Sequence, residues 1–185
     1  EICACLVGSE MCIRDRGIYM DTDIEVLKPF DETILKNNIV FSLDGEGYLS
    51  ALMMSVPRQS FFAEMLDFYH NMSFLKDDGS FNMEVNNTFL QKKLTTLGYK
   101  QENVLQKISD GIIFYPDDYF HCRSLVSGKL NKTSNTYTIH WHTITWVPMK
   151  TRIINFLRIY VIVPLVGYKL YIKLIKKLKG DATYI

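Results

Sequence analysis

The sequence is short of cysteine, proline and net charge. Three of its four cysteines fall within the first twelve residues, so the chain lacks the paired spacing of a structural zinc site and the pattern of a disulfide framework. Its composition, 48% apolar and 13% aromatic over 185 residues, excludes a chain that is mainly disordered, collagen-like or coiled coil. What remains is a folded domain with a hydrophobic core of its own.

The net charge of +1 conceals a split along the chain. Residues 1–118 carry 19 acidic and 10 basic side chains, whereas residues 119–180 carry 11 basic side chains and none that is acidic. An asymmetry of this kind points to an anionic partner for the C-terminal end.

The C-terminal segment, residues 151–185, is predicted to form a basic amphipathic helix. One helical face gathers lysines, namely Lys169, Lys173, Lys176 and Lys177. Another face gathers aliphatic residues, namely Leu170, Leu174, Ile175 and Leu178. The longest uncharged run within this segment, residues 159–168, has ten residues, about half of what spans a bilayer. We therefore expect residues 151–179 to lie on an anionic membrane surface, with no nucleic-acid partner; a helix packed on its own domain is the alternative.

Strand and helix patterns alternate along residues 17–150, which predicts an α/β domain. Short apolar or alternating runs predict strands over residues 17–20, 24–27, 39–43, 49–56, 112–115 and 137–142. Helices are expected over residues 60–71, with Ser60 as the N-cap, and over residues 85–98, with Gly98 as the C-cap.

The sequence Asp21-Thr22-Asp23 follows the first expected strand and is the most informative feature of the chain. Side chains two positions apart on an extended segment share a face, so both carboxylates can converge on one hard cation. Mg²⁺ and Mn²⁺ prefer oxygen ligands and are often held by one or two carboxylates together with substrate phosphates. An isolated Asp-x-Asp is also common where loops begin, so the surrounding residues decide its meaning.

Residues 17–27, GIYMDTDIEVL, resemble the G-G-[IVL]-Y-x-D-x-D-x-x-x-[LV] signature of glycosyltransferase family 32, a group that includes capsular polysaccharide enzymes and fungal mannosyltransferases. Two later segments are similar as well: residues 115–120 to the family's Y-P-x-x-x-F segment, and residues 140–146 to its H-x-x-x-x-[ST]-W ending. Arg16 stands where the signature has its first glycine. The resemblance covers about residues 17–150.

The resemblance implies a GT-A fold, a nucleotide-diphosphate sugar as donor, a glycan or glycolipid as acceptor, and a divalent cation, Mn²⁺ or Mg²⁺. It implies that Asp23 binds the metal directly and that Asp21 contacts the donor and helps to position the metal. It further implies that His140 and Trp146, together with Thr145, close over the diphosphate, where His140 can also bind the metal. No protein nucleophile is implied.

Two neighbouring features have simpler interpretations. For His140 and His142, on the last expected strand, we expect opposite orientations, with His142 outside the site. Asp117 and Asp118 follow Pro116 and are expected to form a turn.

Residues 1–16 have no sustained periodicity and resemble strings that precede unrelated reading frames. We therefore expect a non-native leader over residues 1–16, the C-terminal part of a transferase domain over residues 17–150, with its N-terminal half missing, and a membrane-associating tail over residues 151–185. The expected location is the cytoplasmic face of a bacterial plasma membrane, in capsular or cell-surface polysaccharide synthesis, or the Golgi lumen in a eukaryote.

Two alternatives stay open. A phosphohydrolase of the haloacid dehalogenase type also places Asp-x-Asp after an apolar strand, with Asp21 as nucleophile and Asp117 and Asp118 as the later acidic pair; Glu25 then stands where threonine or valine is expected. The second alternative is that the chain is an inactive, truncated membrane-surface module.

Overall fold

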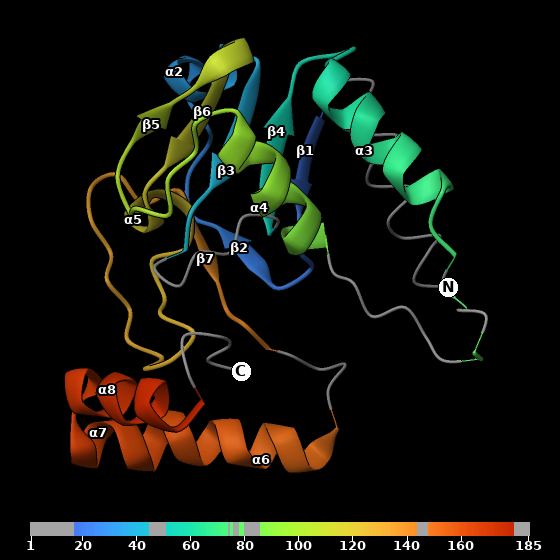
Figure 1. Ribbon diagram of the computed structural model, residues 1–185. Helices are drawn as coiled ribbons and strands as arrows, with labels where there is room; N and C mark the ends of the chain where they lie inside the picture. Colours follow the sequence, from blue (N-terminus) through green and yellow to red (C-terminus); the bar gives the residue numbers. More distant parts are fainter. Residues whose placement is uncertain are drawn as a thin grey trace.

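The structure is a computed structural model that describes residues 17–44, 51–73, 75, 78–79, 86–143 and 148–179. Within these residues it is a mixed α/β protein with one five-stranded and one two-stranded sheet, and with helices at its C-terminal end along one side of the molecule (Figure 1). The predicted α/β class is thus confirmed.

The larger sheet has the strand order β1-β4-β3-β6-β5. Its strands are β1 (Gly17–Met20), β4 (Leu52–Ser55), β3 (Ile39–Ser42), β6 (Ile112–Tyr115) and β5 (Gln106–Lys107). β3 and β6 are parallel, and the other three pairings are antiparallel. Every residue of β3, β4 and β6 is buried, which explains why these strands appear in the sequence as apolar runs without alternation.

One face of this sheet is covered by two helices, α3 (Ser60–His70) and α4 (Asn86–Thr96). Phe41 of β3 lies at the centre of the core beneath them, with ring centroids 5.6 Å from Phe61 and 5.5 Å from Phe114. The N-cap of α3 is Gln59, so Ser60 is its first helical residue rather than the expected cap. After α4, Gly98 has φ of +99° and ends the helix as predicted.

The opposite face packs against the short helices α2 (Glu32–Leu35) and α5 (Asp117–Phe120) and against the chain before β7. Asp117 and Asp118 therefore open a helix instead of forming the expected turn. A single turn of 3₁₀-helix, η1 (Ser109–Gly111), leads into β6.

The second sheet joins two segments that are far apart in the sequence. β2 (Ile24–Val26) pairs antiparallel with β7 (Thr138–His140), so that Ile24 lies opposite His140. This pairing brings the loop after β1 next to the end of β7.

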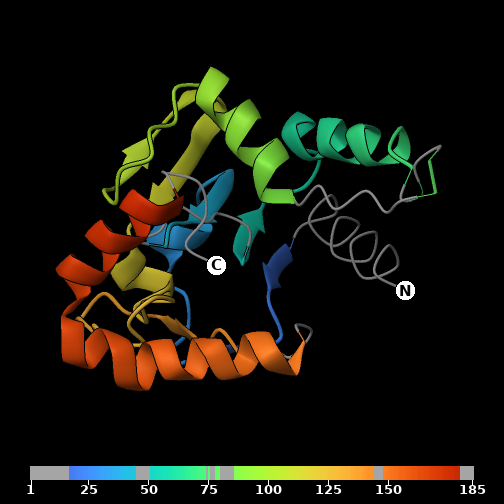
Figure 2. The same cartoon turned by 60° about the horizontal axis from the view of Figure 1, so that its bottom comes forward.

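The C-terminal residues form two helical parts rather than the single helix that the sequence predicted. α6 (Met149–Leu157), the π-helical turn η2 (Arg158–Ile162) and α7 (Val163–Val166) run on from one another, and residues 149–166 are referred to as the C-terminal rod. After Gly167, at φ of +84°, α8 (Tyr168–Lys179) continues at 113° to it (Figure 2). Among the described residues no one helix has the length and apolar character to cross a bilayer, although the bent pair Met149–Val166 and Tyr168–Ile175 has them jointly, judged by length and composition alone.

Candidate functional site

The site begins in the turn between β1 and β2, where Asp21 is held from two sides. Its main-chain N–H donates to the carbonyl of Ala51 at 2.9 Å, which continues the β1–β4 pairing by one residue. The Tyr19 hydroxyl donates to Asp21 Oδ1 at 2.7 Å. The Ile24 N–H donates to the Asp21 carbonyl at 3.1 Å and closes the turn, so the backbone reverses between the two carboxylates.

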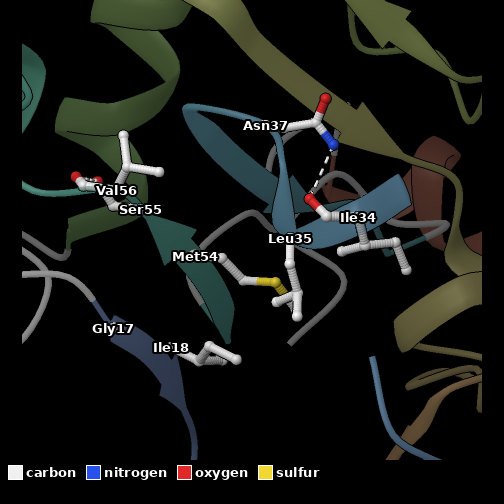
Figure 3. Close-up of a pocket in the computed structure, with 8 residues that line it drawn as sticks. All are labelled: Gly17, Ile18, Ile34, Leu35, Asn37, Met54, Ser55 and Val56. Atoms are coloured by element: carbon white, nitrogen blue, oxygen red, sulfur yellow. Dashed lines mark hydrogen bonds between the residues drawn. The ribbon is translucent and has the colours of Figure 1, made fainter. Parts of the chain in front are cut away.

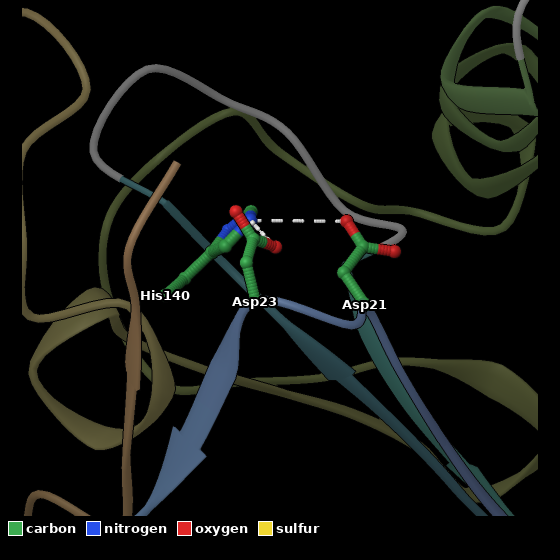
Figure 4. Close-up of side chains that lie close together, drawn as sticks. All are labelled: Asp21, Asp23 and His140. Atoms are coloured by element: carbon green, nitrogen blue, oxygen red, sulfur yellow. Dashed lines mark ion pairs between the residues drawn. The ribbon is translucent and has the colours of Figure 1, made fainter. Parts of the chain in front are cut away.

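His140 reaches this turn from the end of β7. Its Nε2 lies 3.1 Å from Oδ1 of Asp23 and 3.8 Å from Oδ2 of Asp21 (Figure 4). One possible ligand atom from each of the three residues lies within 4.8 Å of the other two, which is a spacing that a single ion can bridge. The β2–β7 pairing creates this cluster, because it places residues 24 and 140 opposite one another.

The segment after β7 holds Asp23 by its other oxygen. The main-chain N–H of Thr143 donates to Asp23 Oδ2 at 2.7 Å, and the Thr143 hydroxyl donates to the same atom at 3.1 Å. The Trp141 N–H donates to the Asp23 carbonyl at 3.0 Å, while its indole N–H donates to Glu25 at 2.9 Å. Oδ1 of Asp23 is thereby directed toward His140.

The two carboxyl groups differ in their electrostatics. Burial raises the pKa of Asp21, and the nearby Asp23 carboxylate raises it further, so that its pKa stays above the usual value despite the Tyr19 hydrogen bond and the His140 ring. Burial also raises the pKa of Asp23, but the hydrogen bonds from Thr143 and the His140 ring outweigh it, and its pKa lies below the usual value. Asp23 is therefore the more firmly ionised of the two, as the direct ligand of a cation should be.

His142 lies beside His140, contrary to the expectation that the two would face opposite ways. The expectation was wrong, because side chains two positions apart on an extended segment share a face. β7 ends at His140 and the backbone at His142 adopts φ of +52°, yet the two rings remain neighbours. Their ring centroids are 3.9 Å apart. His142 Nε2 lies 3.1 Å from the carbonyl of Arg123 and donates to it, and this hydrogen bond fixes the ring beside the cluster.

His121 is a further neighbour, and the sequence contains no signal for it. Its buried ring lies 5.2 Å from that of His140, centroid to centroid. Ser42 donates its hydroxyl to the Leu52 carbonyl at 3.0 Å and accepts from His121 Nε2 at 2.6 Å, which assigns the ring proton to Nε2. Burial, together with the rings of His140 and His142, holds the pKa of His121 well below its usual value, so the ring is neutral.

The donor set fits a divalent cation. Two carboxylates and one imidazole nitrogen converge, and the other ring nitrogen of His140, Nδ1, is buried with no hydrogen-bond partner among the described residues. A neutral His140 with its proton on Nδ1 presents a lone pair at Nε2, toward the carboxylates, without losing a hydrogen bond seen in the structure.

The remaining predicted residues lie elsewhere. Thr145 and Trp146 fall outside the described residues. Asp118 accepts hydrogen bonds from Thr133 and Asn135, at 2.9 and 3.1 Å, and belongs with Asp117 to no ion-sized cluster in the part of the chain that the structure describes. The later acidic pair that a haloacid dehalogenase requires is therefore not assembled by Asp117 and Asp118.

A pocket lies apart from the cluster, at the other end of β1. Apolar side chains dominate its lining, including Ile18, Leu35, Met54 and Val56 (Figure 3). It contains neither carboxylate of the Asp-x-Asp motif, and the chemistry of the site does not involve it.

A comparison of the chain with protein-family models, with curated proteins and with solved structures finds no match.

Proposed function

We propose that this chain is a metal-dependent glycosyltransferase that moves a sugar from a nucleotide diphosphate to a glycan or glycolipid acceptor, as in capsular or cell-surface polysaccharide synthesis. The convergence of Asp21, Asp23 and His140 is the observation that carries the proposal. These are the three residues to which the resemblance to glycosyltransferase family 32 assigns the metal. His140 follows Asp23 by 117 positions and Asp21 by 119. A GT-A fold is part of the same proposal.

The chemistry requires charge neutralisation more than a nucleophile. The bond between the anomeric carbon of the sugar and the diphosphate oxygen breaks, a bond from that carbon to an acceptor hydroxyl oxygen forms, and the hydroxyl proton is released. A bound divalent cation neutralises the diphosphate and makes it a better leaving group. Asp23 and Asp21 supply the negative charge that retains such an ion, and His140 adds a nitrogen donor, which favours Mn²⁺ over Mg²⁺.

Mn²⁺ binding, followed by the electron paramagnetic resonance of the free ion, tests the site without requiring turnover. We expect one Mn²⁺ per chain and a loss of affinity of at least about tenfold in both Asp23→Asn and His140→Gln. Asp67→Asn, which removes an exposed carboxylate on α3, is the matched control and should bind as the unmodified chain does. Equal Mn²⁺ affinity in all these variants would show that Asp23 and His140 do not bind the metal.

Nucleotide release from UDP-sugars and GDP-sugars tests the reaction itself. Release should require Mn²⁺, stop with EDTA and fall strongly in Asp23→Asn. If the chain binds Mn²⁺ but releases no nucleotide from any sugar donor, the metal site is supported and the proposed transferase activity is contradicted. Covalent capture of a phosphate analogue on Asp21 would instead establish a phosphohydrolase.

A further inference from the structure

The C-terminal rod buries two polar side chains, next to apolar ones, on the side that faces the protein. Asn155 and Arg158 are only 8% and 5% exposed, and Val163 continues the same buried side. Arg158 Nη2 donates to the carbonyl of Leu125 at 3.1 Å, so the guanidinium fastens the rod to the loop that follows α5. A helix on the surface of a soluble protein typically has its apolar stripe inward and its polar side toward water.

The outward side of the rod is apolar. Large apolar side chains of the rod that are between 41% and 81% exposed include Met149, Ile153, Phe156, Leu157, Tyr160, Val161 and Leu165. This set is referred to as the outer stripe. The rod runs along the edge of the molecule in both views (Figures 1 and 2), and the exposed fractions show that the side chains of the outer stripe are not covered by the rest of the described chain. A continuous exposed stripe of this kind marks a surface that meets another apolar phase or partner.

Positive charge accompanies the outer stripe. Lys150 and Arg152 extend from the first turns of the rod, and both are exposed. On α8, exposed lysines lie next to exposed leucines, in the pairs Lys169 and Leu170, Lys173 and Leu174, and Lys177 and Leu178. Because the sequence has no acidic residue between positions 119 and 180, this charge is not balanced locally.

We propose that the outer stripe and the leucine side of α8 bind in the plane of an anionic membrane, with the leucines and aromatic rings at the level of the acyl-chain boundary and the lysines at the headgroups. Apolar residues flanked only by basic ones match such a surface in both polarity and charge. A second copy of the chain matches it poorly, because the basic residues of two copies would be brought together. This inference is independent of sugar transfer, since lipid binding is its readout.

In-plane binding follows from the attachment of the rod. Its 18 residues are about 27 Å long, close to the thickness of a bilayer core. However, Asn155, Arg158 and Val163 are buried on one side along the middle half of the rod, and Arg158 donates to the Leu125 carbonyl. A rod that crossed the membrane would have to lose these contacts, whereas a rod that lies on the membrane keeps them and uses only its outer stripe.

Cosedimentation of the full chain with vesicles tests the proposal. We expect binding to mixed phosphatidylcholine and phosphatidylglycerol vesicles, little binding to pure phosphatidylcholine, and release by high salt. Replacing Lys169, Lys173 and Lys177 by Gln should weaken binding on the order of 100-fold, because each basic residue near an anionic surface contributes about fivefold. The triple variant Ile153→Gln, Phe156→Gln, Leu165→Gln should abolish it.

A control variant separates loss of the stripe from loss of exposed apolar surface in general. Val104→Gln with Leu105→Gln changes two side chains of similar exposure on the main domain and should bind vesicles normally. Circular dichroism and urea unfolding of each variant confirm that the fold is retained. Since the replaced residues are exposed, we expect all the variants to fold.

Four results would overturn the proposal. Equal binding to neutral vesicles would show that anionic lipid does not contribute to binding. Normal binding by the stripe variant would show that the outer stripe is not the binding surface. Retention on the membrane through high salt and alkaline washing would indicate a spanning segment. A dimer in solution that the stripe variant converts to a monomer, without vesicle binding by the unmodified chain, would identify a second copy as the partner.

Discussion

The main-chain N–H of Thr143 lies 2.7 Å from Oδ2 of Asp23 and donates a hydrogen bond to it, although the two residues are 120 positions apart in the sequence. The hydroxyl of Thr143 adds a second hydrogen bond of 3.1 Å to the same oxygen. Asp23 is thus held in place by the segment after β7, and Oδ1 is the oxygen that faces Asp21 and His140. The end of β7 therefore both supplies a side chain to the site and orients a carboxylate of the Asp-x-Asp motif.

Replacing Thr143 by Val tests this orienting role. The variant loses the hydroxyl donor and keeps the main-chain N–H, so the carboxylate loses one of its two fixed donors. Groups that orient a metal ligand typically affect metal affinity 10- to 100-fold. We expect the Mn²⁺ affinity to fall about tenfold, with the fold unchanged. Thr96→Val, an exposed threonine on α4, is the control, and equal affinity in both variants would contradict the role.

The half-buried, neutral ring of His142 leads to a prediction about acid stability. Burial, and after it the adjacent His140 ring, lowers the pKa of His142 to about 4. In the unfolded chain the pKa is about 6.5. Between these two values the unfolded state takes up a proton that the folded state does not, so stability is complete above about pH 6.5 and declines as the pH falls toward 4. The loss reaches about 3 kcal/mol for this residue.

Urea unfolding in EDTA at about pH 7 and about pH 4.5 measures this loss. The variant His142→Gln keeps an N–H donor for the Arg123 carbonyl but does not titrate. Its free energy of unfolding should therefore fall less between the two pH values than that of the unmodified chain. Burial, the largest cause of the low pKa of His121, is the same in both proteins, so the contribution of His121 changes little between them. A pH dependence that is identical in the two proteins would show that the pKa of His142 is not lowered in the folded state.

The parts of the fold that could be predicted are those with a strong local pattern. β3 and β6 are buried on both faces, so their apolar runs are visible in the sequence, and α4 ends at Gly98 because that residue takes a positive φ. β5 contains only Gln106 and Lys107 and is held through backbone hydrogen bonds with β6. Its polar residues give no strand signal, because pairing of this kind depends on the neighbouring strand rather than on side chains.

The residues of the candidate site likewise differ in how far the sequence alone could identify them. Asp21 and Asp23 could be recognised from their spacing, and His140 from the resemblance to a family motif. The position of His121 depends on tertiary structure, because the end of α5 brings its ring to Ser42 of β3. The nearness of His142 to His140 could have been predicted, because residues two positions apart on a strand share a face. The burial of polar side chains by the C-terminal rod could not be predicted, because its basic residues suggested that the polar side would face water.

A hydrogen bond between Asp31 and Tyr137 connects α2 to the segment before β7. Asp31 caps α2 by accepting from the N–H groups of Thr33 and Ile34, and the Tyr137 hydroxyl donates to its second carboxyl oxygen. The Thr33 hydroxyl, followed by Tyr137, lowers the pKa of Asp31 to about 2. Because the folded pKa is lower than the unfolded pKa of about 4, this contribution to stability is complete above pH 4 and is lost as the pH falls toward 2.

The variant Tyr137→Phe should raise the pKa of Asp31, and carbon-13 NMR of its carboxyl group measures the change directly. We also expect Tyr137→Phe to be less stable than the unmodified chain at neutral pH, with the difference closing as the pH falls toward 2. Tyr160→Phe, at an exposed tyrosine of the rod, should leave both quantities unchanged. An Asp31 pKa that does not respond to Tyr137→Phe would show that the hydrogen bond does not form in solution.

Gly128 controls the contact between the main domain and the C-terminal rod. It has φ of +66°, and a Cβ added to it would lie 2.6 Å from Cγ2 of Ile159. Gly128→Ala therefore combines left-handed strain with a steric clash, and we expect a loss of about 2–4 kcal/mol in the free energy of unfolding. Gly98→Ala is the matched control, since φ is +99° there but nothing lies within 4 Å of the added Cβ, and it should lose about 1 kcal/mol.

The second change Ile159→Ala removes the methyl group that the new Cβ would meet, and so separates the clash from the strain. In the background of Gly128→Ala we expect it to restore part of the lost stability, whereas in the unmodified chain it should be destabilising. Amide hydrogen exchange over α6 should rise in Gly128→Ala and fall again in the double variant, because the clash lies at the surface where the rod docks. Equal losses for Gly128→Ala and Gly98→Ala, with no rescue, would mean that the rod yields to the added methyl group without cost and is only loosely attached to the main domain.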